Sequence, residues 1–229
     1  MEAAAEHCLR VGPIGKAVGP AIILIPPLFD ESNRMRRTLV LTMRALGWLG
    51  HACALPDLPG QNDSLLPTES ATLTLWRSAL AQFCADEGDP PLIASWRGGA
   101  LIDDAAQGAI GWWRMAPLAG ASIVRAMMRV RIAGEKEAGR NITADDLRAA
   151  AVNGPIELAG NRLSAAMVAE LEAATPALAA PVREVRTGSG DGAIAGSALW
   201  LRADPGEDAM MAEAMAADIH AWALQCAAG

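Results

Sequence analysis

Several features that would define a protein class are missing from this sequence. Its 19 lysines and arginines form no basic run and the net charge is −7, so nucleic acid is not an expected partner. The four cysteines are widely separated, with no C-x-x-C pair for zinc or redox chemistry, and are expected to be reduced core thiols. We therefore expect neither a metal nor a cofactor.

Long apolar runs are missing as well. Residues 1–13 carry the charged Glu2, Glu6 and Arg10 and no apolar stretch of signal-peptide length. The most apolar run, residues 21–29, is interrupted by Pro26 and Pro27 and falls far short of the roughly 20 residues that span a bilayer. The sequence thus predicts a cytoplasmic protein without a membrane span.

What is present is an alternation of short apolar segments and helical patterns. The 229 residues, 52% hydrophobic, can bury one sizeable core, so a single domain is expected over residues 1–229. Strands are predicted at residues 21–25, 51–55, 91–94, 112–116, 182–186 and 198–202. Helices are predicted at residues 33–46, with Asn33 as the cap, and at 71–85, 120–133, 143–151 and 208–226, together with a small-residue helix after Gly99. This order predicts a mostly parallel sheet with helices on both faces and a small helical cap at about residues 118–175.

The segment Ser95-Trp96-Arg97-Gly98-Gly99 joins a predicted strand to a predicted helix. Small residues two before and two after the central position permit the sharp turn of the G-x-S-x-G motif. We therefore predict an α/β-hydrolase fold. The nucleophile position holds Arg97, whose permanently charged guanidinium cannot attack a carbonyl.

A catalytic base is missing together with the nucleophile. The loop after the last predicted strand, residues 203–207, should supply the histidine but contains none. Structural roles are expected for the three histidines of the chain, His7, His51 and His220. Centring the motif on Ser95 would require a small residue at position 97, so no Ser-His-Asp triad is predicted.

The loop at residues 26–33 occupies the place where this fold supplies an oxyanion-hole N–H, and it carries Asp30 and Glu31. Either carboxylate is expected to pair with Arg97. The pair would either fix the loop or form part of a binding site, because Arg97 at a helix N-terminus would attract a carboxylate or phosphate. The side chains expected around such a ligand are Phe29, Asn33, Trp96 and the small Gly98, with Trp112 and Trp113 as possible walls.

Two further segments bear on the same pocket. Residues 57–64 are similar to the D-x-x-G-x-G-x-S loop of this fold, in which Asp63 and Ser64 make turn hydrogen bonds. The predicted cap helix carries Arg125, Arg129 and Arg131. This series is either an anion-attracting surface or simply the solvated face of the helix.

The chain resembles the exosortase A system-associated hydrolase 2 family over residues 21–173. The matching positions are Pro26, Pro27, Glu31, Asn33, Arg36, Arg37, Arg97, Gly154, Glu157, Ala159, Gly160, Leu163 and Ser164. Asp30 stands for the first of two family glutamates, Ser95 for the first glycine of G-x-R-x-G, and Asn161 for a tyrosine. The resemblance implies an α/β-hydrolase fold, a cytoplasmic location and an exopolysaccharide or PEP-CTERM sorting context.

Two functional hypotheses follow. The first is a non-hydrolytic protein that binds a small anionic or acyl ligand, or a partner, near Arg97, Asp30 and Glu31. The second is an ester or thioester hydrolase in which Asp30 or Glu31 activates water and Arg97 stabilises the oxyanion. A purely structural role and a homodimeric state stay open.

Overall fold

A seven-stranded sheet forms the centre of the computed structural model, which describes residues 6–229. The strands lie in the order β1 (Cys8–Val11), β3 (Cys53–Pro56), β2 (Ile22–Ile25), β4 (Leu92–Trp96), β5 (Gly111–Met115), β8 (Val182–Thr187) and β9 (Ala193–Ile194). Only β1 runs antiparallel to its neighbour, and the remaining pairs are parallel. The mostly parallel sheet predicted from the sequence is confirmed.

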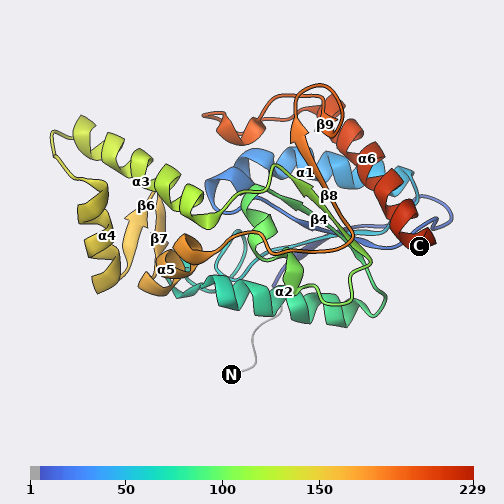
Figure 1. Cartoon of the computed structure of the whole chain (residues 1–229), viewed down its shortest axis with the longest axis horizontal. Coiled ribbons are helices and arrows are strands. Elements are labelled where there is room, and N and C mark those ends of the chain that lie inside the picture. The colour runs from blue at the N-terminus through green and yellow to red at the C-terminus, as the bar shows by residue number, and fades with distance from the viewer. Residues whose placement is uncertain (1–5) are drawn as a thin grey trace.

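The central strands are short and apolar because both of their faces are covered. Every residue of β2 and β4 is buried. One face packs against α1 (Asp30–Trp48) and α6 (Ala209–Ala228), and the other against α2 (Leu73–Glu87). Figure 1 shows α1 and α6 above the sheet and α2 below it.

The chain between β5 and β8 leaves the sheet and returns to it. It forms α3 (Gly120–Glu137), α4 (Ala144–Asn153), the hairpin β6 (Ile156–Leu158) and β7 (Asn161–Leu163), and α5 (Ala165–Ala173). These elements lie together at the left of Figure 1, and their apolar side chains join the cluster that also covers α2. The predicted capping box of α4 is present, since Thr143 and Asp146 bond each other's backbone.

Several details of the sequence prediction are wrong. Residues 198–202 form no strand but hold the 3₁₀ turn η4 (Leu199–Leu201), while β9 is the edge strand instead. The helix after the elbow is replaced by two 3₁₀ turns, η2 (Arg97–Leu101) and η3 (Asp103–Ala105). The first helix is capped by Phe29 rather than Asn33. Strand β1 was not predicted, because one antiparallel edge strand next to charged residues gives little apolar signal.

Within residues 6–229, no helix is long and apolar enough to cross a membrane. All four cysteines are free thiols, with Cys53 and Cys84 buried and Cys8 and Cys226 half-buried. Burial raises the pKa of Cys53 to about 12 and that of Cys84 to about 11, so neither is a ready nucleophile.

Candidate functional site

The turn after β4 has the backbone geometry of a nucleophile elbow. Arg97 has φ 55°, a left-handed conformation that non-glycine residues rarely adopt. A Cβ on Gly99 would lie 2.6 Å from the carbonyl oxygen of Pro26 and 2.8 Å from that of Ile25. Position 99 must therefore be glycine for the chain to pass the end of β2, as the motif predicts.

The guanidinium of Arg97 is held by its surroundings. Its Nε and Nη2 donate to the two carboxylate oxygens of Glu31 at 3.1 and 3.2 Å, and Nη1 donates to the carbonyl of Ala116 at 3.3 Å. The guanidinium carbon also lies 4.9 Å from the ring centre of Trp200. The Arg97 and Glu31 side chains are 17% and 25% exposed, so an anion would have to displace a bidentate, half-buried carboxylate.

The structure separates the two acidic residues of the loop. Both lie in the first turn of α1, where carboxylates favour the helix dipole. Glu31 pairs with Arg97, whereas Asp30 accepts a hydrogen bond of 3.1 Å from the amide of Asn161 on β7. Asp30 thus contacts the hairpin beyond β5 rather than the elbow, and Asn33 is exposed one helical turn further on.

Apolar side chains fill the space beside the elbow glycine. A Cβ on Gly98 would lie 2.6 Å from Ile123 of α3 and 3.0 Å from Leu28. Phe29, 4% exposed, packs on the ring of Trp76 at a centroid distance of 5.5 Å. The loop that would supply an oxyanion-hole N–H is therefore anchored in the core.

Trp96 lies in the core and not in a pocket. It is 0% exposed, its ring centre lies 5.2 Å from that of Trp113, and its indole N–H points at the sulfur of Met215 on α6 at 3.2 Å. Because side chains of successive strand residues point to opposite faces, Trp96 faces α1 and α6. We leave it out of the proposed site.

Ser95 is equally inaccessible. Its hydroxyl donates to the carboxylate of Asp103 at 2.7 Å, and that carboxylate also receives Nε and Nη2 of Arg114 at 2.8 and 2.7 Å. All three side chains are buried. Asp103 lies at the start of the second of the two 3₁₀ turns that follow the elbow, and the long helix expected after Arg97 is absent from the described structure.

The histidines lie away from the elbow. His51 and His220 contact each other at 2.8 Å, and His51 also contacts the carbonyl of Pro20, which leads into β2. Pro20 lies at the amino end of β2, whereas Arg97 follows the carboxyl end of the parallel strand β4. The two histidines therefore lie at the opposite end of the strands from the elbow. Among the described residues, the histidine and carboxylates close enough to share a metal ion are His7, Asp57 and Asp63, which lie beside β3.

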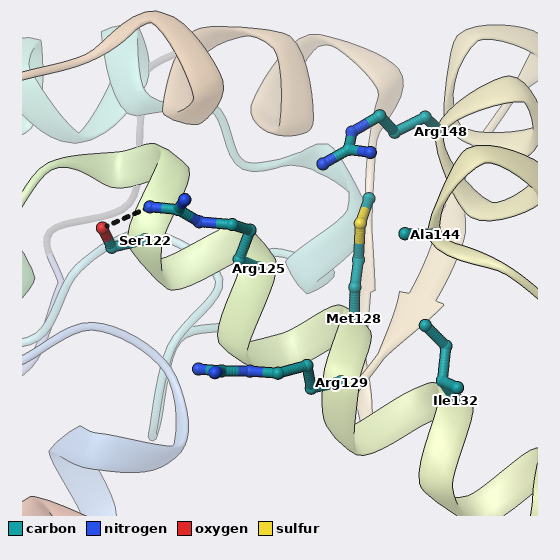
Figure 2. Close-up of a pocket in the computed structure, with 7 residues that line it drawn as sticks. All are labelled: Ser122, Arg125, Met128, Arg129, Ile132, Ala144 and Arg148. Atoms are coloured by element: carbon teal, nitrogen blue, oxygen red, sulfur yellow. Dashed lines mark hydrogen bonds between the residues drawn. The ribbon is translucent and has the colours of Figure 1, made fainter.

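An open pocket of about 440 Å³ lies between α3 and α4 (Figure 2). It is lined by Ser122, Arg125, Met128, Arg129, Ile132, Ala144 and Arg148. In Figure 2 the side chains of Arg125 and Arg129 lie to the left of Met128, Ile132 and Ala144 lie to its right, and the Arg148 guanidinium lies above the end of Met128. The pocket therefore combines an apolar wall with a cationic one.

The three arginines of the pocket differ in the number of carboxylates that pair with them. Arg148 pairs with Asp145 at 3.1 Å and Glu172 at 3.3 Å. Arg125 donates only to the hydroxyl of Ser122, and Arg129 has no ion-pair partner within residues 6–229. Arg131, in contrast, faces Glu135 and Glu157 and lies outside the pocket.

Sequence reasoning named two of the seven residues that line this pocket, Arg125 and Arg129, which stand four residues apart and hence on one face of the helix. It did not single out Met128 and Ile132, which have the same spacing, and it placed Arg131 in the same series although Arg131 lies outside the pocket. Nothing in the sequence pairs that face with Arg148 or Ala144, because the contact of α3 with α4 depends on the turn between them.

The parallel sheet, its antiparallel first strand and the strained turn after β4 define an α/β-hydrolase fold. The chain is similar to the structure of a putative hydrolase from Agrobacterium vitis S4, with TM-score 0.59, 18% identity, and 94% of this chain and 92% of that chain covered. It is similar to a thermophilic esterase from Thermogutta terrifontis (malate bound), with TM-score 0.56, 14% identity and coverage of 96% and 93%. Mouse α/β hydrolase domain-containing protein 10 gives TM-score 0.55, 17% identity and coverage of 78% and 71%.

At these identities the likeness concerns the fold alone. A scan against protein-family models found no match, and a search of curated proteins found none either. The exosortase-associated resemblance accordingly stays a prediction.

Proposed function

We propose that this chain is a non-hydrolytic α/β-hydrolase-fold protein that binds a small anionic ligand with an acyl or other apolar part. The bidentate pair of Arg97 with Glu31 at the elbow carries the proposal. A guanidinium in the nucleophile position cannot attack a carbonyl. The pair also engages Glu31, one of the two carboxylates that the alternative hydrolase could use as a base, whereas Asp30 accepts a hydrogen bond from Asn161.

The ligand site that we propose is the pocket between α3 and α4 rather than the elbow itself. Within residues 6–229, Arg125 and Arg129 have no carboxylate partner, so they supply positive charge in a molecule whose net charge is −7. Met128 and Ile132 supply an apolar surface next to that charge. A ligand with an anionic head group and a hydrocarbon chain can pair with the arginines and bury its chain against the apolar side chains.

In this proposal the site residues predicted from the sequence have a structural role. Arg97, Glu31, Asp30 and the buried Phe29 hold the loop after β2 against the elbow and against β7. The exosortase-associated and exopolysaccharide context is carried by the sequence resemblance alone. The presence of an exosortase gene beside the coding gene is the observation that would support it.

Hydrolysis is tested with p-nitrophenyl esters and an acyl thioester on the wild type, Arg97→Ala and Arg97→Ser. We expect no turnover above that of buffer in any of the three, because the loop of residues 203–207 supplies no base. Wild-type turnover that disappears in Arg97→Ala would overturn the non-hydrolytic assignment.

Binding is tested by calorimetric titration of decanoate into the wild type and an Arg125→Ala/Arg129→Ala double variant. We expect the double variant to lose roughly tenfold or more in affinity, because hydrogen bonds to charged groups contribute about 1.5–3 kcal/mol each. Arg44→Ala, at an exposed arginine on α1, is the control and should bind like the wild type. Equal affinity in all three proteins, or no binding by the wild type, would contradict the pocket assignment.

A further inference from the structure

Three side chains that the proposed function does not use converge beside the end of β3. They are His7, which precedes β1, Asp57, which follows β3, and Asp63 in the loop beyond. One ligand atom from each lies within 4.8 Å of the other two. The backbone holds these three residues close together. The N–H of Asp57 donates to the carbonyl of His7 at 2.9 Å, and Asn62, with φ 49°, turns the loop that carries Asp63.

The carboxylate of Asp57 points to a missing ligand. Its side chain is 1% exposed, and its Oδ1 accepts from Arg36 at 3.1 Å and from Asn62 at 2.6 Å. Its Oδ2 has no hydrogen-bond partner in the described structure and faces Nδ1 of His7 at 3.6 Å. A buried carboxylate oxygen without a partner is costly, and a cation beside it removes that cost.

The charges around the cluster also favour a cation. Asp57 and Asp63 contribute two negative charges, and the neighbouring Arg36 contributes one positive charge on the far oxygen of Asp57. The two carboxylates therefore exceed the single guanidinium by one negative charge. Both His7 and Asp63 are exposed, so an ion has a path from solvent.

We propose that His7, Asp57 and Asp63 form a zinc-binding site. One imidazole nitrogen and two carboxylate oxygens are ligands that Zn²⁺ accepts, and water completes a tetrahedron as at other three-ligand sites. No metal motif predicts this site, because His7 lies fifty residues before Asp57 in the chain and the spacing of Asp57 and Asp63 matches no ligand pattern. The ion joins the segment before β1 to the loop after β3, beside the carboxyl ends of the strands.

The test uses untagged protein, so that no added histidines bind metal, and titrates Zn²⁺ by calorimetry. His7→Gln and Asp63→Asn change exposed residues and should fold normally, whereas Asp57→Asn would also disturb Arg36. We expect each of the two variants to weaken zinc binding by about tenfold or more. Asp89→Asn, at an exposed carboxylate outside the cluster, should bind zinc like the wild type.

X-ray absorption of the zinc-loaded protein separates this site from the other candidates. Nitrogen and oxygen neighbours without sulfur are expected, which excludes Cys8 next to His7. Retained affinity in both His7→Gln and Asp63→Asn would place the ion elsewhere, for example at the His51–His220 pair, and would overturn the proposal. Failure of the wild type to bind zinc would overturn it as well.

Discussion

At the residue scale, the backbone geometry of the elbow does not depend on the chemistry of its central side chain. Gly99 is required by the passing carbonyl of Pro26, and Arg97 holds a left-handed φ although it is no nucleophile. The left-handed φ of Arg97 and the close approach of Gly99 to Pro26 both follow from the path of the backbone. The chemistry depends only on the side chain at position 97 and its partners.

Gly99→Ala is expected to destabilise the protein. Its Cβ would meet two backbone oxygens below 3 Å, and overpacking of this kind typically costs roughly 1–3 kcal/mol. The matched control is Gly134→Ala in α3, where a Cβ meets nothing within 4 Å and the alanine should stabilise the helix by about 0.5–1 kcal/mol. Urea unfolding of the two variants measures both effects, and equal stability of the two would contradict the argument.

His51 is expected to make stability depend on pH. Burial lowers the pKa of His51 in the folded protein, with a smaller opposing effect of the Pro20 carbonyl. The unfolded chain therefore binds the proton more readily, so the contribution of neutral His51 is complete above about pH 6.5 and is lost as the pH falls towards the folded pKa. The free energy of unfolding should decrease over this range in the wild type and decrease less in His51→Asn.

The sequence predicted the residues of the elbow better than their partners. The spacing of Ser95, Arg97 and Gly99 located the turn, because that spacing reflects local sterics. It did not decide between Asp30 and Glu31, since the choice depends on where α1 begins. Nor did it show that Trp96 faces the core, because both faces of a buried parallel strand look alike in sequence.

At the scale of elements, prediction succeeded where a periodic apolar pattern was long. Helices α1, α2, α3 and α6 and strands β2 to β5 lie close to their predicted positions. Helix α5 was not predicted, nor were the short β1, β9 and the β6–β7 hairpin, in which two to four residues carry little periodic signal. The small-residue segment after Gly99 has helical composition, but its Asp103 is held by Arg114.

The capping box of α4 provides a prediction at this scale. Thr143→Ala removes the hydroxyl that accepts from the N–H of Asp146 and should cost about 1 kcal/mol. Hydrogen exchange should rise in residues 144–153 and near the pocket wall formed by Ala144 and Arg148. Thr143→Ser keeps the hydroxyl and should leave exchange unchanged. An increase spread evenly over the whole chain would count against a local effect.

At the scale of the whole molecule, two apolar clusters share one sheet. One cluster joins the sheet to α1 and α6, and the other joins it to α2 and to the elements of residues 120–173. Strands β2, β4 and β5 contribute side chains to both clusters. Because these strands are shared, the loss of packing in one cluster would disrupt the strands against which the other cluster packs.

We therefore expect the whole chain to unfold in one cooperative transition. Tryptophan fluorescence, dominated by the core, and far-UV circular dichroism should give the same urea midpoint. An earlier change confined to residues 120–173, detected by hydrogen exchange, would instead show that the predicted cap is a separate unit. Light scattering of the eluting protein in the same buffer decides whether it is a monomer or the homodimer left open by the sequence.

The strained elbow has a consequence for how such a protein changes over evolutionary time. Because the left-handed turn follows from the passage of Gly99 past β2, it persists whichever side chain stands at position 97. The path of the chain therefore does not prescribe the chemistry of position 97, although the left-handed φ disfavours β-branched side chains there. A serine at position 97 would still lack a histidine in the loop of residues 203–207, so two positions far apart in the chain would have to change together for a triad to form.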